Sequence, residues 1–269
     1  MSARTGERLD ASDALYAADL ARHRAAYRFA AARAGTACVL DLGCGTGYGS
    51  AELAAGGVRV VGLDRVAPAA GPQRSAARFV RGELGALPFA AASFDLVVSF
   101  QVIEHLLDPT DYLREIARVL RPAGLLLLST PNLLQSDREN PYHVHEYTAA
   151  ELAAALAGWF GGVEMLGVGA VGPAARFQAE RLARIRRITR LDPLGIRRRL
   201  PRPLVEWLFA RLSLLVRLGA RRGGALEPVS EAHFPIASAD AACLDLLAVC
   251  RAPRPLAQRG RSAMRGLPT

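Results

Sequence analysis

The chain has 269 residues, of which 51% are apolar and 22% are charged, and its formal net charge is +9. This composition supports a large hydrophobic core and excludes a globally disordered protein. The longest strongly apolar stretch, 204–218, is interrupted by charged residues, so no segment predicts a transmembrane helix, which needs ~20 apolar residues. Residues 1–13 lack the apolar core of a secretory signal, and the four cysteines lack metal-finger spacing, so a reduced, cytoplasmic setting is expected.

The positive charge is concentrated in one region of the chain. All 34 cations are arginines, a choice that GC-rich coding explains, but residues 174–225 hold 14 of them against only three acids. The remainder of the chain is close to neutral. The excess charge is therefore a property of one segment and not of the whole protein.

Helical and apolar segments alternate along the first two thirds of the sequence. Ala-rich or amphipathic stretches predict helices, and short apolar runs ending near glycine or acidic residues predict buried strands. The expected helices are 9–34, 50–55, 110–120 and 148–160, with a weakened helix or loop at 67–77, and the expected strands are 38–42, 58–63, 78–81, 94–100, 125–130 and 163–168. This alternation predicts a parallel sheet covered by helices on both faces.

The alternation stops after residue 173. Residues 174–222 have no strand signal and predict two helices separated by prolines, after which the apolar run 243–250 predicts a last buried strand. The predicted organisation is an N-terminal helical segment (1–36), a core (37–173), a basic helical insertion (174–230), a segment with the final strand (231–252) and a disordered tail (253–269).

The most informative motif is VLDLGCGTGYGS at 39–50, in which Gly43, Gly45 and Gly47 alternate directly after an apolar strand. Glycines at such a turn let the backbone bend tightly and let a ligand approach the main chain. The dinucleotide fingerprint G-x-G-x-x-G fails in both registers, because Tyr48 and Ser50 stand where its third glycine would be. This disfavours a nicotinamide oxidoreductase.

The run instead resembles the D-x-G-x-G-x-G motif of class I S-adenosylmethionine-dependent methyltransferases, including methyltransferase type 11-like, bacterial glycan or secondary-metabolite and ubiquinone-biosynthesis O-methyltransferases. The resemblance covers about residues 36–132 and includes VVGLD (60–64), GEL (82–84), FDLVVS (94–99) and LREIARVLRPAG (113–124). It implies a Rossmann-like, doubly wound α/β fold with a mostly parallel seven-stranded sheet, here carrying an Arg-rich helical insertion before the last strand. It also implies S-adenosyl-L-methionine as the cofactor.

The resemblance further implies roles for individual cofactor-binding residues. Asp41 would hold the methionine amino group, although the same carboxylate is also explained as a structural turn or cap residue. The remaining contacts would come from Gly43 and Gly45 to methionine and ribose, Asp64 to the ribose hydroxyls, Glu83 and Leu84 to adenine, and Gln101 beside the sulfonium.

Histidines are the candidates for the catalytic base. The run QVIEH (101–105) resembles the E-x-x-E-H run of ubiquinone-biosynthesis O-methyltransferases, whose acids and histidine hold a divalent metal. Gln101 replaces the first acid, and hard cations prefer several charged oxygens, so no metal ion is expected. His105 is interpreted either as a base or as a structural residue opening the next helix.

A second histidine cluster lies in NPYHVHEYT at 140–148. It resembles a segment of bacterial methyltransferases of glycan and secondary-metabolite pathways that reaches the acceptor site, which places His143 or His145 in the acceptor pocket. The alternative is a helix lead-in in which Thr148 and Glu151 form a capping box. Both interpretations are compatible.

The favoured function is methyl transfer to a hydroxyl of a sugar or small metabolite, including a lipid-linked or polysaccharide precursor. A catalytically idle cofactor-binding protein is the alternative. For the basic insertion, four interpretations stay open: a lid over the acceptor, contact with an anionic membrane surface through 174–222, an RNA contact, and a solvated helical pair. Few aromatic side chains disfavour RNA. Membrane contact would place the protein at the inner membrane surface. The sequence gives no signal for an oligomeric state.

Overall fold

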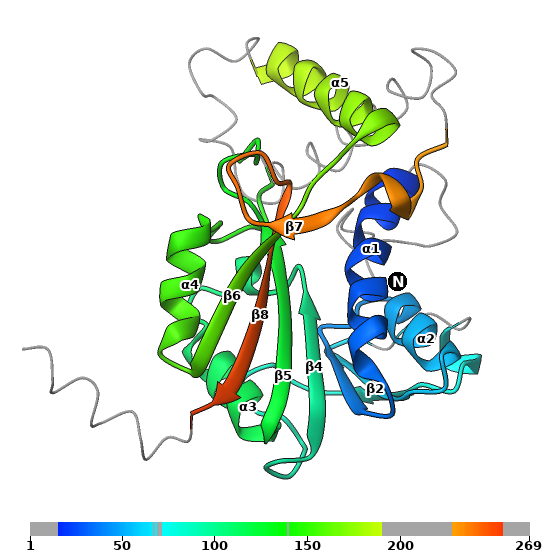
Figure 1. The fold of residues 1–269 in the computed structure, drawn as a ribbon, viewed down its shortest axis with the longest axis vertical. Coiled ribbons are helices and arrows are strands. Elements are labelled where there is room, and N and C mark those ends of the chain that lie inside the picture. The colour runs from blue at the N-terminus through cyan, green and yellow to red at the C-terminus, as the bar shows by residue number, and fades with distance from the viewer. Residues whose placement is uncertain (1–15, 67, 69–71, 139, 190–227, 255–269) are drawn as a thin grey trace, which may run out of the picture.

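The computed structural model describes residues 16–66, 68, 72–138, 140–189 and 228–254 of the chain (Figure 1). Eight strands form one sheet: β1 (Cys38–Leu42), β2 (Arg59–Asp64), β3 (Arg78–Arg81), β4 (Phe94–Phe100), β5 (Leu120–Pro131), β6 (Phe160–Val168), β7 (Ile236–Ser238) and β8 (Asp245–Pro253). Their order in the sheet is β3-β2-β1-β4-β5-β8-β6-β7. The last strand of the chain is therefore inserted between β5 and β6.

The sheet is mostly parallel, as the sequence predicts. β3, β2, β1, β4 and β5 pair in parallel, whereas β8 pairs antiparallel with both β5 and β6. The expected seven strands are present, and the structure adds an eighth, β7, which pairs antiparallel with β6. β7 has only three residues, Ile-Ala-Ser, so it is too short to give a periodic signal.

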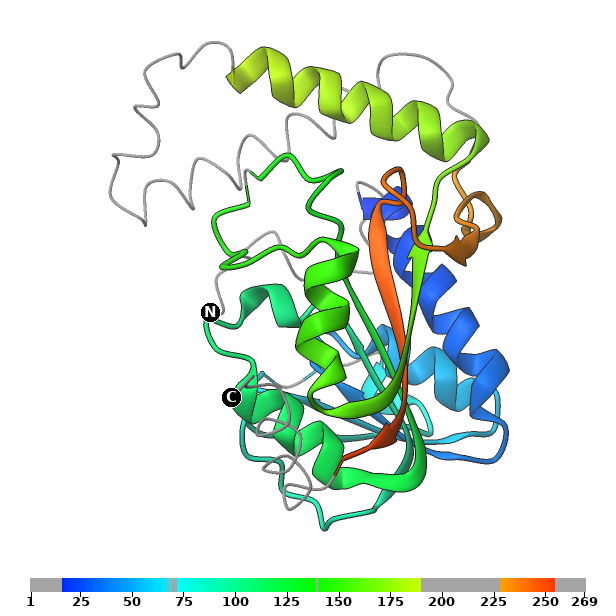
Figure 2. The same cartoon turned by 60° about the vertical axis from the view of Figure 1, so that its left-hand side comes forward.

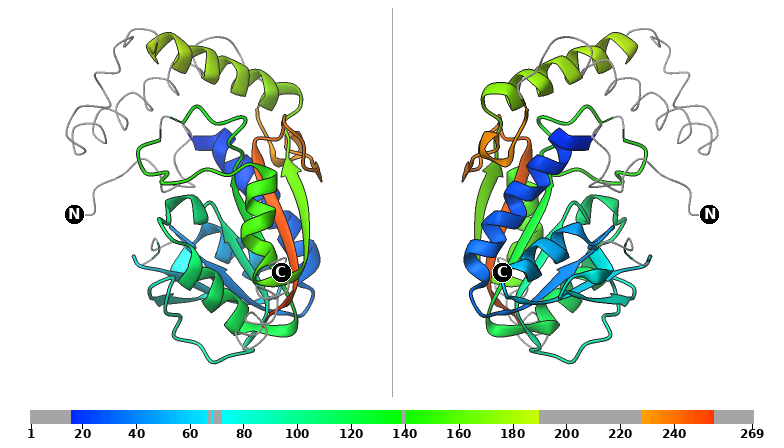
Figure 3. Two further views of the ribbon diagram at one scale, coloured as in Figure 1. Left: turned by 90° about the vertical axis from the view of Figure 1, so that its left-hand side faces the viewer. Right: turned by 90° about the vertical axis from the view of Figure 1, so that its right-hand side faces the viewer.

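Helices cover both faces of the sheet (Figures 1 and 3). α1 (Ala17–Ala34) and α2 (Tyr48–Ala55) lie on one face, and α3 (Thr110–Val119) and α4 (Ala149–Ala157) lie on the other. Single turns of 3-10 helix occur at Pro72–Arg74, Ile103–His105 and Glu231–His233. α5 (Gly172–Thr189) follows β6 and crosses the end of the molecule above the loop after β5 (Figure 2).

Two separate cores form because successive strand side chains point to opposite faces. In β1, Val39 packs with the buried side of α1 and α2, whereas Leu40 and Leu42 pack with α3 and α4. All three side chains are fully buried. Four of the five residues of β1 are apolar because each face of the sheet packs against a layer of helices.

Several local predictions can be compared directly with the structure. Thr148 and Glu151 form the predicted capping box at the start of α4. β5 starts at Leu120, opposite Phe94, and so begins before the predicted strand 125–130. The expected helix or loop at 67–77 contains only the short turn Pro72–Arg74 among its described residues.

The insertion is described only in part. α5 begins at Gly172, two positions before the predicted insertion boundary. The second of the two helices predicted within 174–222, at 203–222, lies outside the described residues, as does the tail from 255 onward. The proposed domain boundaries therefore remain predictions. Among the described residues, no helix combines the length and the apolar character needed to cross a membrane.

Candidate active site

A cavity of about 880 Å³ opens at the carboxyl ends of the parallel strands. Its walls come from the loops after β1, β2, β3, β4 and β5, from the N-terminal half of α1, and from α5. The glycine loop and the acids after β2 and β3 line the same cavity as His105 and His143. Ligands of open α/β sheets bind at this edge, so the cavity is the candidate active site.

The glycine loop after β1 is shaped by backbone conformations that favour glycine. Gly43 and Gly45 have φ of +79° and +57°. A Cβ on Gly43 would lie 2.5 Å from Cγ2 of Val102, whereas a Cβ on Gly45 would meet no protein atom within 4 Å. Because Gly45 also lines the cavity, the space beside its main chain is open to a ligand. The structure thus places both predicted glycines at the cavity wall.

Asp64 ends β2 and lines the cavity, as expected. Its Oδ2 accepts a hydrogen bond from the Gly45 N–H at 2.9 Å, and its Oδ1 accepts one from the Val66 N–H at 3.0 Å. These bonds fix the carboxylate against the glycine loop. Two acceptor oxygens on one carboxylate are the feature that recognition of a ribose diol requires.

Asp41 lies beneath the glycine loop and does not line the cavity. Only 1% of its surface is exposed, and its carboxylate accepts hydrogen bonds from the Tyr27 hydroxyl at 3.2 Å and from Ser50 Oγ at 2.5 Å. Burial raises the pKa of Asp41 to about 6, although both hydrogen bonds oppose this. The structure therefore supports a positioning role, and the expected water-mediated contact with methionine remains a prediction.

Glu83, Leu84 and Gln101 all line the cavity. The backbone of Glu83 pairs with Ala86 in a tight turn after β3, and this turn presents the Glu83 and Leu84 side chains at the cavity edge. Gln101 follows β4 with a φ of +57°, and its main-chain N–H donates to the Ser129 carbonyl at 2.9 Å. All three residues thus lie on the wall of one cavity, and their contacts with a cofactor remain predictions.

Two of the three predicted histidines meet in the cavity. The rings of His105 and His143 are 5.3 Å apart between centroids. His105 Nδ1 lies 3.0 Å from the Tyr142 carbonyl oxygen, and His143 Nδ1 lies 2.6 Å from Glu146 Oε1. The hydrogen bond from His143 and nearby positive charge hold the pKa of Glu146 below its usual value, although burial, the largest single influence, acts in the opposite direction.

His145 is placed differently from the expectation. It is exposed, does not line the cavity, and packs its ring edge against Tyr147 with the centroids 4.4 Å apart. The turn at 141–142 and the bend at 144 break the regular alternation of side chains, so the two histidines of the HVH sequence face different surroundings. Of the pair offered by the sequence, only His143 is in the cavity.

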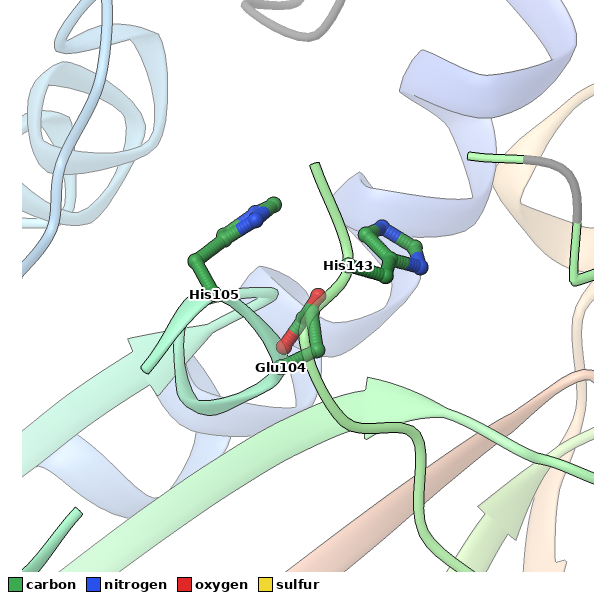
Figure 4. A group of neighbouring side chains, drawn as sticks. All are labelled: Glu104, His105 and His143. Carbon is green, nitrogen blue, oxygen red and sulfur yellow. The ribbon is translucent and has the colours of Figure 1, made fainter. Parts of the chain in front are cut away.

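Glu104 belongs to the site, although sequence reasoning did not select it. The residue is fully buried, and Thr130 Oγ1 donates to its Oε2 at 3.0 Å. Burial raises the pKa of Glu104 to about 7 against the opposing influence of His105 and His143. Figure 4 shows the Glu104 carboxylate beside the two imidazoles. One ligand atom from each of these three residues lies within 4.8 Å of the other two, so the group could hold a metal ion.

The N-terminal helix contributes further residues that the sequence did not indicate. Arg22 and Tyr27 on α1 line the cavity, and Arg22 Nε lies 3.3 Å from Oδ2 of the buried Asp245 on β8. Burial raises the pKa of Asp245, whereas Arg22 opposes the shift. These contacts join segments at the two ends of the sequence, and no local pattern signals them.

The first half of the chain is similar to known methyltransferases. Residues 40–128 match the model of the family described as "Methyltransferase domain". A probable S-adenosylmethionine-dependent methyltransferase of Mycolicibacterium smegmatis is 42% identical over 145 residues, which are 50% of this chain and 56% of that protein. A protein of Mycobacterium tuberculosis with the same description is 41% identical over 145 residues, which are 50% of this chain and 52% of that protein. The chain thus matches little more than half the length of these relatives.

Solved structures support the fold. A SAM-dependent methyltransferase of Thermotoga maritima, described as a possible histamine N-methyltransferase, superimposes with a TM-score of 0.52 at 13% identity. The match covers 88% of this chain and 97% of that protein. At this identity the likeness concerns the fold alone.

Proposed function

We propose that this chain, a member of the class I S-adenosylmethionine-dependent methyltransferases, transfers a methyl group to a hydroxyl of a sugar or small metabolite. One observation carries the proposal: a single cavity joins the glycine loop and Asp64 to the histidine pair His105 and His143. A methyl donor held at the first group would direct its reactive end toward an acceptor held at the second.

The cofactor end fits the methyl donor of the family, S-adenosylmethionine. The open space beside Gly45 admits a ligand against the main chain, and the Asp64 carboxylate offers acceptors for two ribose hydroxyls. Glu83 and Leu84 would flank the adenine ring, and Gln101 would lie beside the sulfonium. These assignments agree with the position of each residue on the cavity wall.

The chemistry requires the chain to position an acceptor oxygen and to remove its proton. S-adenosylmethionine supplies an electrophilic methyl group, whose carbon–sulfur bond breaks as the carbon–oxygen bond to the acceptor forms. The departing thioether is neutral, so no general acid is needed. His105 and His143 are held with Nδ1 against an oxygen acceptor, so Nε2 of either ring is the atom that would take the hydroxyl proton.

The acceptor end has both apolar and polar walls. Leu106, Val144 and Leu182 line the cavity together with Gln178 and Arg181 of α5. We therefore expect an acceptor that combines hydroxyl groups with an apolar portion, such as a glycosylated or lipid-linked metabolite. Since α5 contributes directly to this wall, the start of the basic insertion forms part of the acceptor site.

The proposal includes contact between the basic insertion and an anionic membrane surface. On α5, Arg176, Arg186 and Arg187 are exposed and would meet lipid phosphates. Flotation with vesicles of anionic lipid tests this directly. We expect co-flotation at low salt that is lost at high salt, and absence of binding at low salt contradicts the membrane contact.

The enzymatic proposal is tested by mass spectrometric detection of S-adenosylhomocysteine after incubation with S-adenosylmethionine and a panel of hydroxylated acceptors. We expect stoichiometric formation of an O-methyl product. Replacing His143 by alanine should lower kcat by roughly 10²-fold or more, since general bases contribute about that much. His145→Ala is the matched control, because His145 lies outside the cavity. Cofactor binding without turnover on any acceptor would favour a catalytically idle protein.

A further inference from the structure

We infer that Glu104, His105 and His143 form a binding site for a divalent transition-metal ion at the acceptor end of the cavity. One ligand atom from each residue lies within 4.8 Å of the others. All three residues line the cavity, so an ion there would be accessible to an acceptor. The expectation of no metal came from the loss of an acid at Gln101, but the structure brings a third ligand, His143, from another loop.

Glu104 is the buried anchor of this site. Its side chain is fully buried, and its Oε2 is occupied by the hydrogen bond from Thr130. Its other oxygen, Oε1, is buried and has no hydrogen-bond partner among the described residues. An unpaired buried carboxylate oxygen is unfavourable, and coordination of a cation would satisfy it.

The backbone holds the three ligands together. The carbonyl oxygen of Glu104 accepts hydrogen bonds from the Val144 N–H at 2.7 Å and the His145 N–H at 3.2 Å. These bonds fix the loop after β5 against the turn after β4 and so determine how close His143 lies to Glu104. The site is therefore built by main-chain contacts and does not depend on the positions of long, exposed side chains.

Both imidazoles have the orientation that metal-binding histidines usually show. His105 Nδ1 lies 3.0 Å from the Tyr142 carbonyl oxygen, an atom that can only accept, so this nitrogen carries the proton. His143 Nδ1 lies 2.6 Å from the Glu146 carboxylate and is assigned the same proton. The lone pair of each ring is then on Nε2. Ligating histidines characteristically donate their other N–H to a carbonyl or a carboxylate.

The ligand set indicates the class of ion. Two imidazole nitrogens and one carboxylate oxygen suit Zn²⁺, Co²⁺, Mn²⁺ or Fe²⁺, whereas Mg²⁺ and Ca²⁺ prefer ligand sets made only of oxygen. Three protein ligands leave coordination positions open. Two carboxylates, Glu104 and Glu146, stand at or behind the site, so a divalent cation would also balance their charge.

The role of the ion, unlike its binding, rests on the proposed function. An acceptor hydroxyl that occupies an open position would lose its proton more readily, because a cation stabilises the resulting oxyanion. The two histidines would then act as ligands, and the hydroxyl proton would pass to solvent. This would make the proposed methylation metal-dependent.

Binding is tested with the metal alone, without methyl donor or acceptor. The full-length protein is freed of metal by chelation and titrated with Co²⁺, whose visible absorption reports nitrogen coordination, and Zn²⁺ is added as a competitor. We expect one ion per chain. Glu104→Gln and His143→Ala should abolish the Co²⁺ spectrum, and Glu146→Gln should weaken affinity by roughly 10- to 100-fold, since it removes the partner of a ligand.

His145→Ala is the matched control, because it removes a neighbouring histidine outside the cavity and should leave the titration unchanged. Circular dichroism checks that each variant folds, and the partly exposed His143 provides the decisive variant should Glu104→Gln unfold. The inference is overturned if the wild type binds no Co²⁺, if Glu104→Gln and His143→Ala bind it normally, or if Mg²⁺ displaces it at equal concentration. Metal binding without methyl transfer would count against the proposed function only.

Discussion

Replacing Asp41 by asparagine tests how the glycine loop is supported from beneath. Burial raises the pKa of Asp41 from its ordinary value of 3.8 to about 6. The native state therefore holds this proton more tightly than the unfolded chain does, so the free energy of unfolding falls as the pH rises through this range. At ~1.4 kcal/mol per pKa unit, ionised Asp41 costs the native state roughly 3 kcal/mol above pH 7.

Asparagine cannot ionise but retains the size of the side chain and one acceptor oxygen. We therefore expect the stability of Asp41→Asn, relative to the wild type, to increase by roughly 2–3 kcal/mol between pH 4 and pH 7. Urea unfolding followed by circular dichroism at a series of pH values, without cofactor, measures this difference. Glu104 also has a raised pKa, but it is present in both chains and cancels.

Asp95→Asn is the control, because the pKa of Asp95 is shifted in the opposite direction to that of Asp41. The Cys38 N–H and the Arg121 guanidinium hold the pKa of Asp95 below its ordinary value. The native Asp95 carboxyl is therefore ionised throughout this range, and the unfolded one is already mostly ionised at pH 4, so the difference profile should change little between pH 4 and pH 7. A flat profile for Asp41→Asn as well would refute the argument, because it would mean that the buried carboxylate carries no ionisation penalty.

Three further substitutions test the site. Asp64→Ala should reduce S-adenosylmethionine affinity, measured by calorimetry, by roughly 10- to 100-fold, since charge-assisted bonds contribute ~1.5–3 kcal/mol; unchanged affinity would mean that the ribose lies elsewhere. Gly45→Ala should weaken cofactor binding more than Gly57→Ala. Both glycines have a positive φ and no protein atom near the added Cβ, but only Gly45 lines the cavity. Equal effects would mean that the cofactor does not approach the main chain at Gly45. Tyr27→Phe should lower the free energy of unfolding, measured with urea at pH 8, by ~1.5–3 kcal/mol, because the Tyr27 hydroxyl donates to the Asp41 carboxylate. Tyr112→Phe should lower it by only ~0.5–1.5 kcal/mol, because the Tyr112 hydroxyl donates to the neutral Ser99. The reverse order would be inconsistent with a charged Asp41.

The residues predicted to bind the cofactor carry local sequence signals. A glycine is required where φ is positive, and an acid at the end of a parallel strand lies at the ligand edge of the sheet. The resemblance to the methyltransferase motifs implied one site for Gly43, Gly45 and Asp64, and all three line the cavity. For Asp41, the sequence could not decide between a contact with methionine and a structural role. Its partner Tyr27 comes from α1, and no sequence motif links that helix to the glycine loop.

The acceptor side is less predictable because it depends on contacts between distant segments. Glu104 and His143 meet only through the hydrogen bonds between the turn after β4 and the loop after β5. The difference between His143 and His145 depends on a local turn, which sequence periodicity does not reveal. The expectation of no metal considered one run of residues, QVIEH, whereas the candidate ligand set draws on two.

The pairing of β6 with β7 fixes where the connection between these two strands leaves the sheet and where it returns. Val168 and Ile236 are register partners, so the chain leaves the sheet and returns to it about 5 Å away, the spacing of neighbouring strands. Any connecting segment therefore starts and ends at the same two positions of the sheet, Val168 and Ile236. Lengthening that segment adds only a small entropic cost of loop closure. Under the proposed function, an exchange of residues 172–235 for the matching segment of a relative should alter acceptor choice and leave the predicted donor pocket intact, so this junction suits the construction of chimeric proteins.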